Sequence, residues 1–127
     1  MSFFYNEGIS TSSASITSSD ITIAGDTTTF SSANSTDPLV VIKNTTNDAN
    51  GARLRFVKDK GAAGADNDAC GIIEFYGDDD NQDNIAFAKI EAIVNDASNG
   101  DECGSLKFYV AENDGNNTVG LLIAGST

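Results

Sequence analysis

The sequence predicts an all-β protein, a compact antiparallel β-sandwich or meander domain preceded by an extended N-terminal arm. Three observations support this fold class: apolar residues after Leu39 recur with period two, no window of ten residues has helical spacing, and the connections are rich in Gly, Asn and Asp. The 127 residues suffice for one domain (39–127) plus an arm (1–38). Leu, Ile, Val and Phe number only 29, so the core is thin and we expect a partner subunit to contribute to stability.

Five segments carry the alternation and are expected to form strands. In the first, Leu54 and Phe56 alternate with Arg53 and Arg55. In the longest, alternation places Phe87 on the same side as Lys89 and Glu91. The five segments are 53–56, 72–76, 85–94, 105–110 and 119–123. The Asn-Gly pairs at 50–51 and 99–100 and the Asp-Gly pair at 114–115 suit turns that need positive φ.

A short repeat of the form D-x-x-G begins at Asp48, Asp68 and Asp101, and each copy opens an expected strand. The second and third copies continue in parallel, as G-I-I-E-F-Y from Gly71 and G-S-L-K-F-Y from Gly104. The first copy slips by one residue between its Gly and its apolar pair. A turn residue, a Gly that allows close approach and then apolar-x-Phe indicate one supersecondary unit used three times.

The two cysteines, Cys70 and Cys103, do not have the spacing of a zinc site. If strand 85–94 lies between the two Cys-Gly strands, these strands are next-nearest neighbours about 10 Å apart, too far for a disulfide. We therefore predict two free thiols, buried or half-buried, that act as small apolar residues.

The N-terminal arm is dominated by small hydroxyl side chains, since 16 of the 29 residues in 9–37 are Ser or Thr. It is either a Ser/Thr tail without structure of its own or an arm that gains order by docking on another protein or its own oligomer. Ile21-Thr22-Ile23 alternates and could form a short strand against a partner. Aromatic side chains supply much of the energy of interfaces. The residues expected to attach the arm are Phe3, Phe4, Tyr5, Ile21, Ile23 and Phe30.

The charge distribution excludes several classes of protein. A net charge of −12 argues against a nucleic-acid binder and against a polybasic membrane-surface peptide. The longest apolar run, 39–42, is too short to span a bilayer, and the N-terminus does not resemble a signal peptide. Five of the seven basic residues fall in 43–60, whereas 66–102 holds eleven acids and only Lys89. Arg53 and Arg55 could face acids across the sheet or on a neighbouring subunit, or simply form a solvated face.

No motif in the sequence indicates an active site or a cofactor. The acidic run 78–83 lacks the Gly and Glu that an EF-hand needs at its sixth and twelfth positions, which leaves a looser Ca²⁺ site or a solvated hairpin tip. There is no phosphate-binding loop and no nucleophile elbow, and without His neither cysteine has an imidazole base. We therefore expect no enzyme, no cofactor and no metal.

Residues 47–118 resemble a module that recurs in virion proteins of tailed phages, particularly appendages of marine and cyanobacterial phages. The matching stretches are GARLRFVKD from Gly51, GIIEFYGDD from Gly71, FAKIEA from Phe87, DAS from Asp96, ECGSLKF from Glu102 and DG from Asp114. The resemblance implies a non-enzymatic protein of the virion exterior, made in the host cytoplasm and commonly trimeric. Such proteins are tail fibres, head fibres or capsid decorations.

The short chain, without an extended repetitive shaft, favours a capsid decoration (cement) protein or a short head fibre. Its expected partners are copies of itself, a trimer being favoured over a dimer, and the major capsid protein or another virion structural protein, with no nucleic acid and no membrane. The alternative is a tail-fibre or receptor-binding module, which would expose an aromatic patch around Tyr76 or Tyr109. A secreted, Ca²⁺-dependent surface protein is a third possibility, against which the absence of a signal peptide counts.

Overall fold

The structure is a computed structural model and describes residues 21–125. The chain divides after Val41 into two units, which are described separately. In the first unit, residues 21–41 contain turns but neither helix nor strand, so Ile21-Thr22-Ile23 does not form a strand within this chain. Its backbone is extended apart from bends such as the turn in which the Asp37 amide donates to the Asn34 carbonyl at 3.3 Å.

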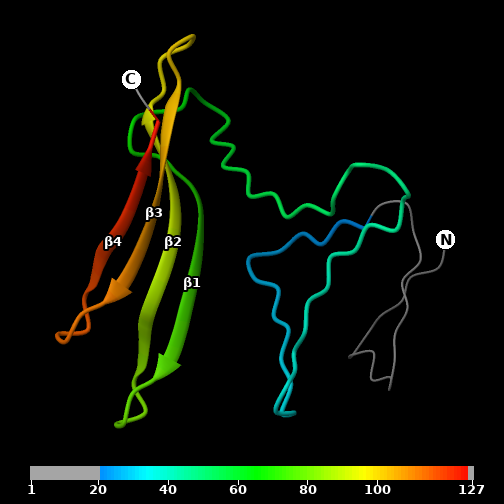
Figure 1. Ribbon diagram of the computed structural model, residues 1–127, viewed down its shortest axis with the longest axis vertical. Helices are drawn as coiled ribbons and strands as arrows, with labels where there is room; N and C mark the ends of the chain where they lie inside the picture. Colours follow the sequence, from blue (N-terminus) through cyan, green and yellow to red (C-terminus); the bar gives the residue numbers. More distant parts are fainter. Residues whose placement is uncertain (1–20, 126–127) are drawn as a thin grey trace. The chain divides into compact units, whose positions relative to one another are not determined.

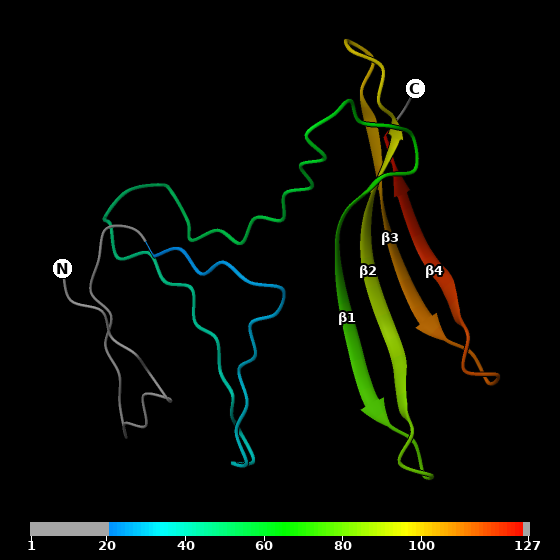
Figure 2. The same cartoon turned by 180° about the vertical axis from the view of Figure 1, so that it is seen from behind.

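The second unit contains a four-stranded antiparallel sheet in which each strand pairs with the next along the chain (Figures 1 and 2). The strands are β1 (Ala69–Asp78), β2 (Asn84–Asp96), β3 (Cys103–Ala111) and β4 (Asn117–Ala124). The structure therefore confirms the all-β fold class and the meander. In residues 21–125 no second sheet packs on the first, so the sandwich alternative is not formed by this part of one chain.

Tight turns join the strands where the sequence supplies residues that tolerate positive φ. Gly100 (φ 94°) and Gly115 (φ 77°) adopt it in the β2–β3 and β3–β4 connections, as predicted. In the β1–β2 connection this role falls to Gln82 (φ 65°). Gly51 is not among the described glycines with positive φ, so the prediction for the first Asn-Gly pair is wrong. No β-hairpin closes at this position, and the special turn is not needed.

The strand predicted at 53–56 is not formed. Residues 51–60 are extended but pair with no strand of the described chain (Figure 1). A strand is defined by hydrogen bonds to a neighbour, and alternation of side chains alone does not supply that neighbour. The first copy of the D-x-x-G repeat therefore differs from the copies that open β1 and β3.

The sheet has no hydrophobic core of its own. No hydrophobic residue is buried in 21–125, and the only buried polar residue there is Ser105, 8% exposed. The thin core expected from the composition is absent from residues 21–125, because a single sheet has no second layer against its faces. Natural sheets bury at least one face.

Both cysteines are free, as predicted, and β2 lies between the strands that carry them. Cys103 is half-buried, but Cys70 is exposed, contrary to the prediction. Cys70 lies at the start of β1, an edge strand, where the pairing with β2 is irregular between Ala69 and Gly71, so no neighbouring strand covers it on the outer side.

Candidate self-assembly surface

One face of the sheet is apolar across all four strands, except for Thr118, which is opposite Val110 near the start of β4. The register shows this directly: Ile73 on β1 is opposite Ile90 on β2, Ile90 is opposite Phe108 on β3, and Phe108 is opposite Leu121 on β4. Directly paired residues lie on the same side of a sheet, and so do residues two positions apart. This apolar face comprises Gly71, Ile73, Phe75, Ala88, Ile90, Ala92, Leu106, Phe108, Val110, Leu121 and Ile123.

A β-bulge adds one more aromatic ring to the apolar face. The register shifts between Phe75 and Tyr76, so that β2 has an extra residue at this point. A Cβ added at Gly77 would lie 3.3 Å from Cε2 of Phe87. Because Gly77 is on the same side of β1 as Phe75, the Phe87 ring lies on the apolar face. The prediction from strict alternation, which placed Phe87 with Lys89 and Glu91, is wrong because a bulge interrupts the period of two.

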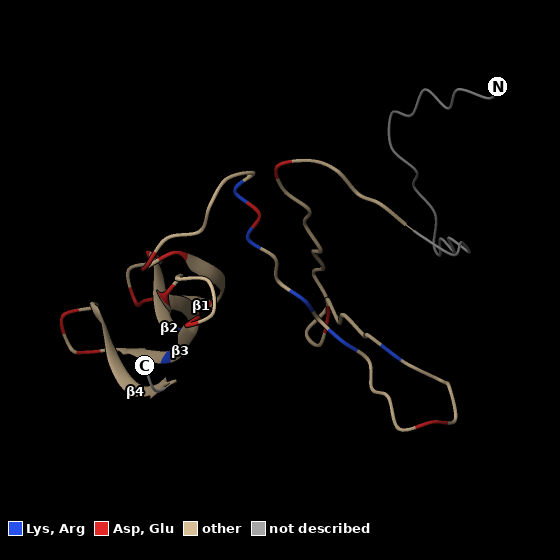
Figure 3. Cartoon of the chain, turned by 90° about the horizontal axis from the view of Figure 1, so that it is seen from above, with Lys and Arg blue, Asp and Glu red and all other residues tan. Residues whose placement is uncertain are grey.

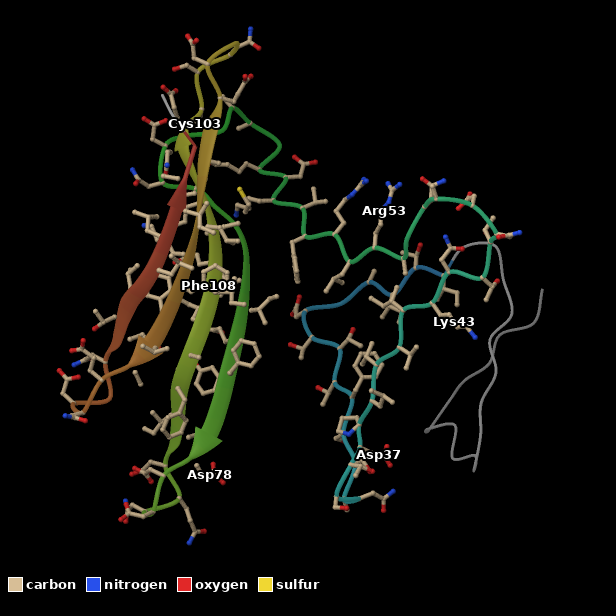
Figure 4. The ribbon with its side chains drawn as sticks, viewed as in Figure 1. Asp37, Lys43, Arg53, Asp78, Cys103 and Phe108 are labelled. Atoms are coloured by element: carbon tan, nitrogen blue, oxygen red, sulfur yellow. The ribbon has the colours of Figure 1, made fainter. Side chains whose placement is uncertain are left out.

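The apolar face is open to solvent. Phe75, Phe87, Val110, Leu121 and Ile123 are each about half exposed, whereas Phe108, labelled in Figure 4, is half-buried on the central part of the sheet. With four strands about 4.8 Å apart and nine residues in β3, the face measures roughly 19 Å by 30 Å. Its flat area of roughly 570 Å² approaches the ≈ 800 Å² that each partner buries in a standard protein interface.

Phe56, an aromatic residue from outside the sheet, covers part of the apolar face. A Cβ added at Gly71 would lie 2.7 Å from Cβ of Phe56, so only Gly fits beneath this side chain. The close approach predicted for the Gly of the repeat is thus confirmed at Gly71. Next to Phe56 is an apolar hollow of about 230 Å³, lined on the sheet by residues that include Ile73, Ile90 and Leu106.

The opposite face has a polar centre. The Tyr109 hydroxyl donates to Oε2 of Glu91 at 2.8 Å, and the Lys89 ammonium donates to the same oxygen at 3.1 Å. Lys89 Nζ also lies 4.2 Å from the centroid of the Tyr109 ring. The register explains this cluster, because Lys89 is directly opposite Tyr109 and Glu91 is two residues along the same strand.

These contacts shift two pKa values in opposite directions. The Tyr109 hydrogen bond, followed by that of Lys89, lowers the pKa of Glu91 from its ordinary 4.5, against the effect of burial. The hydrogen bond to Glu91 and burial raise the pKa of Tyr109 above its ordinary 10.0. The carboxylate of Glu91 therefore stabilises the fold above pH 4.5, and this contribution is lost as the pH falls through the lowered, folded-state pKa. The cluster of Tyr109, Glu91 and Lys89 therefore stabilises the polar face of the sheet.

Charge is segregated along the second unit (Figure 3). Basic side chains follow the extended segment 43–60, and acidic side chains gather at the turns of the sheet. Within residues 21–125 the ion pairs are Lys60–Asp68 at 2.8 Å and Lys89–Glu91 at 3.1 Å. Arg53 and Arg55, which could face acids across the sheet, form no ion pair with the described part of the chain.

The acidic β1–β2 turn is held by hydrogen bonds to the side chain and backbone of Asp79. Oδ1 of Asp79 accepts hydrogen bonds from the amides of Asn81 and Asp83, each at 2.9 Å, and the Asp79 amide donates to the Asp83 carbonyl at 3.0 Å. No group of three or more potential metal-ligating His, Cys, Asp or Glu residues is found over 21–125. Residues 78–83 form the end of β1 and the turn to β2 and are exposed to solvent apart from the half-buried Asp79.

Of the predicted attachment residues, the structure describes Ile21, Ile23 and Phe30, which do not gather into a site within residues 21–125. Phe3, Phe4 and Tyr5 lie outside the described residues. Ile21, Ile23 and Phe30 are all more than half exposed on the extended chain of the first unit. Sequence reasoning concentrated on the arm and did not single out the apolar face as a site, although its alternating side chains were recognised. Within 21–125, no helix is long and apolar enough to cross a membrane.

The fold and surface thus define an all-β protein with one unpartnered apolar face. No family model, curated protein or solved structure matches the chain.

Proposed function

We propose that this chain is a structural, non-enzymatic protein of a phage virion exterior, a capsid decoration protein or a short head fibre that assembles with copies of itself. The observation that carries the proposal is the apolar face, which spans four strands and is open to solvent in a chain whose described residues bury no hydrophobic side chain. A soluble monomer rarely exposes such a surface. The resemblance of 47–118 to phage virion modules supports a place on the virion exterior. A trimer is the favoured assembly.

In this proposal the arm, residues 1–38, attaches the assembly to the major capsid protein or another virion structural protein. A protein that binds only the assembled shell stabilises the shell by mass action. Several arms on one oligomer raise one another's effective concentration at the shell. The net charge of −12 keeps decorated particles soluble and apart.

Co-sedimentation with capsids tests the role of the arm. A variant lacking residues 2–37 should self-associate like the full chain but remain in the supernatant when capsids are pelleted. A full-length control with Phe3, Phe4 and Tyr5 replaced by Ser should lose part of the binding, because the aromatic anchors are removed at constant length. Unchanged co-sedimentation of the deletion variant would refute attachment through the arm.

The second candidate is a receptor-binding module at the tip of a tail fibre. Exposed Tyr76, 56% accessible near the end of β1, is the observation that favours it. Tyr109, the other residue expected in such a patch, is instead hydrogen-bonded to Glu91. Quantifying copies per virion separates the two functions: a high copy number, spread over the shell, supports decoration, and a low copy number in multiples of three supports a fibre.

A further inference from the structure

Residues 51–58 form an extended segment whose backbone has no hydrogen-bond partner in 21–125. The bonds nearby all lie outside this segment, such as that from Asn44 Nδ2 to the Asn50 carbonyl at 2.9 Å. Leu54 and Val57 are about two-thirds exposed or more, and Phe56 is half exposed although it lies against the sheet at Gly71. Apolar side chains on an unpaired extended backbone are the form a strand has before it joins a sheet.

The chain is fastened to the sheet just after this segment. Lys60 pairs with Asp68 at 2.8 Å, and the Val94 amide on β2 donates to the Asp68 carbonyl at 2.9 Å. Phe56 lies over the apolar face at Gly71 and is not beside β1 in the plane of the sheet. Before Phe56 the chain leaves its own sheet, and the outer edge of β1 stays unpaired (Figure 1).

The sequence of the segment is that of a strand. The two other copies of the D-x-x-G repeat open β1 and β3, and the segment repeats their pattern of apolar-x-Phe, with Leu54 and Phe56 on one side and Arg53 and Arg55 on the other. The edge of β1 offers the matching pattern: Ile73 and Phe75 on the apolar face, with Glu74 and Tyr76 on the polar face. Glu74 forms no ion pair with any described residue, and neither does Arg55.

We propose that residues 51–58 of one chain add as a strand to the β1 edge of a second copy of the chain, with Arg55 opposite Glu74. Leu54 and Phe56 then extend the apolar face next to Ile73 and Phe75. Parallel and antiparallel addition both place Arg55 opposite Glu74, because in each strand the charged residue lies between the two apolar ones.

Charge complementarity identifies the occupant as another copy of this chain. The segment is the basic part of a chain that is otherwise acidic, and the β1 edge carries Glu74 and Asp78. The other free edge, β4, has no charged residue and gives Arg53 and Arg55 no counter-ion. The inference rests on the proposed self-assembly, to which it adds the partner surface and the residue pair.

Interchain disulfide trapping tests the pairing directly. In full-length chains with Cys70 and Cys103 replaced by Ser, one tagged chain carries R55C and a co-expressed chain of different size carries E74C. Residues directly opposite in neighbouring strands have the Cα separation that a disulfide accepts. We expect a mixed disulfide of the two chains after mild oxidation. The matched control replaces E74C by L122C, which is on the same face but on β4, and should give no mixed disulfide.

A charge exchange gives a second readout without cysteines. R55E should weaken self-association about fivefold, the effect of placing like charges opposite each other in a sheet. The double variant R55E/E74R should restore it, whereas K43E, an equal change of charge outside the segment, should leave it unchanged apart from a general salt-dependent effect.

Each outcome separates the inference from the proposed function. A monomeric chain at all concentrations overturns both. An oligomer in which R55C forms a mixed disulfide with L122C but not with E74C overturns the addition of residues 51–58 to the β1 edge of a second copy. So does a chain carrying both R55C and E74C that forms only an intrachain disulfide. Neither outcome contradicts self-assembly. A mixed disulfide between R55C and E74C, together with rescue by R55E/E74R, supports the inference.

Discussion

Replacing Leu121 by Gln should dissociate the assembly, whereas the same replacement at the next residue, Leu122, should not. The two leucines are adjacent on β4 and equally exposed in the single chain, at 52% and 53%. They differ in the face they occupy: Leu121 is opposite Phe108 on the apolar face, and Leu122 is opposite Lys107 on the polar face. Any difference between the two variants therefore comes from what covers the apolar face.

The size of the effect follows from the exposed fraction. Complete burial of a Leu side chain contributes about 1.5–3 kcal/mol, so covering the exposed half of Leu121 contributes about 1 kcal/mol. Burying an unpaired amide in its place costs about 1–3 kcal/mol more. The total of about 2–4 kcal/mol per copy weakens the dissociation constant about 30-fold or more. Leu122→Gln leaves the side chain in water and should change the free energy by less than about 0.5 kcal/mol.

Sedimentation velocity of the full chain over a series of concentrations measures both variants, with circular dichroism as a check on the sheet. Since the described chain has no core of its own, L121Q should lose oligomers and sheet signal together at low concentration. Equal behaviour of the two variants, or a larger effect of L122Q, would refute burial of the apolar face by a partner.

Three further predictions concern the polar face and the acidic turn, with stability compared at one fixed protein concentration. Tyr109→Phe removes the hydrogen bond that lowers the pKa of Glu91, so acid unfolding should begin at higher pH in a denaturant series between about pH 3 and about pH 6. Tyr76→Phe, at an exposed tyrosine, should have no effect. An equal shift in both variants would contradict the stabilising role of the Tyr109–Glu91 hydrogen bond. Asp79→Ala should lower the free energy of unfolding by about 1 kcal/mol, because two backbone amides lose their acceptor. Asp80→Ala should change the free energy of unfolding little. A larger loss for Asp80→Ala than for Asp79→Ala would contradict the role of Asp79. Calcium and magnesium at equal concentration should shift the melting temperature equally, since no ligand cluster is found in 21–125, and a calcium-specific shift would reveal a site.

The local pattern of the sequence determined most of the sheet. Alternation of apolar and polar side chains predicted segments that lie within β1, β2, β3 and β4, because a strand exposes its two sides in turn whatever surrounds it. The glycines of the second and third turns were also predictable, since positive φ is a property of the single residue. The free thiols followed from the order of the strands alone.

Only the tertiary structure decided which segments pair and which side chains meet. Leu54 and Phe56 alternate as well as the residues of any strand, yet no described strand pairs with them, because pairing is a relation between two segments and not a property of one. A bulge moved Phe87 to the apolar face, and the register between β2 and β3 placed Tyr109 against Glu91. Composition indicated a thin core, and the tertiary structure showed why: the apolar side of the single sheet is largely uncovered, since one layer cannot bury its own face.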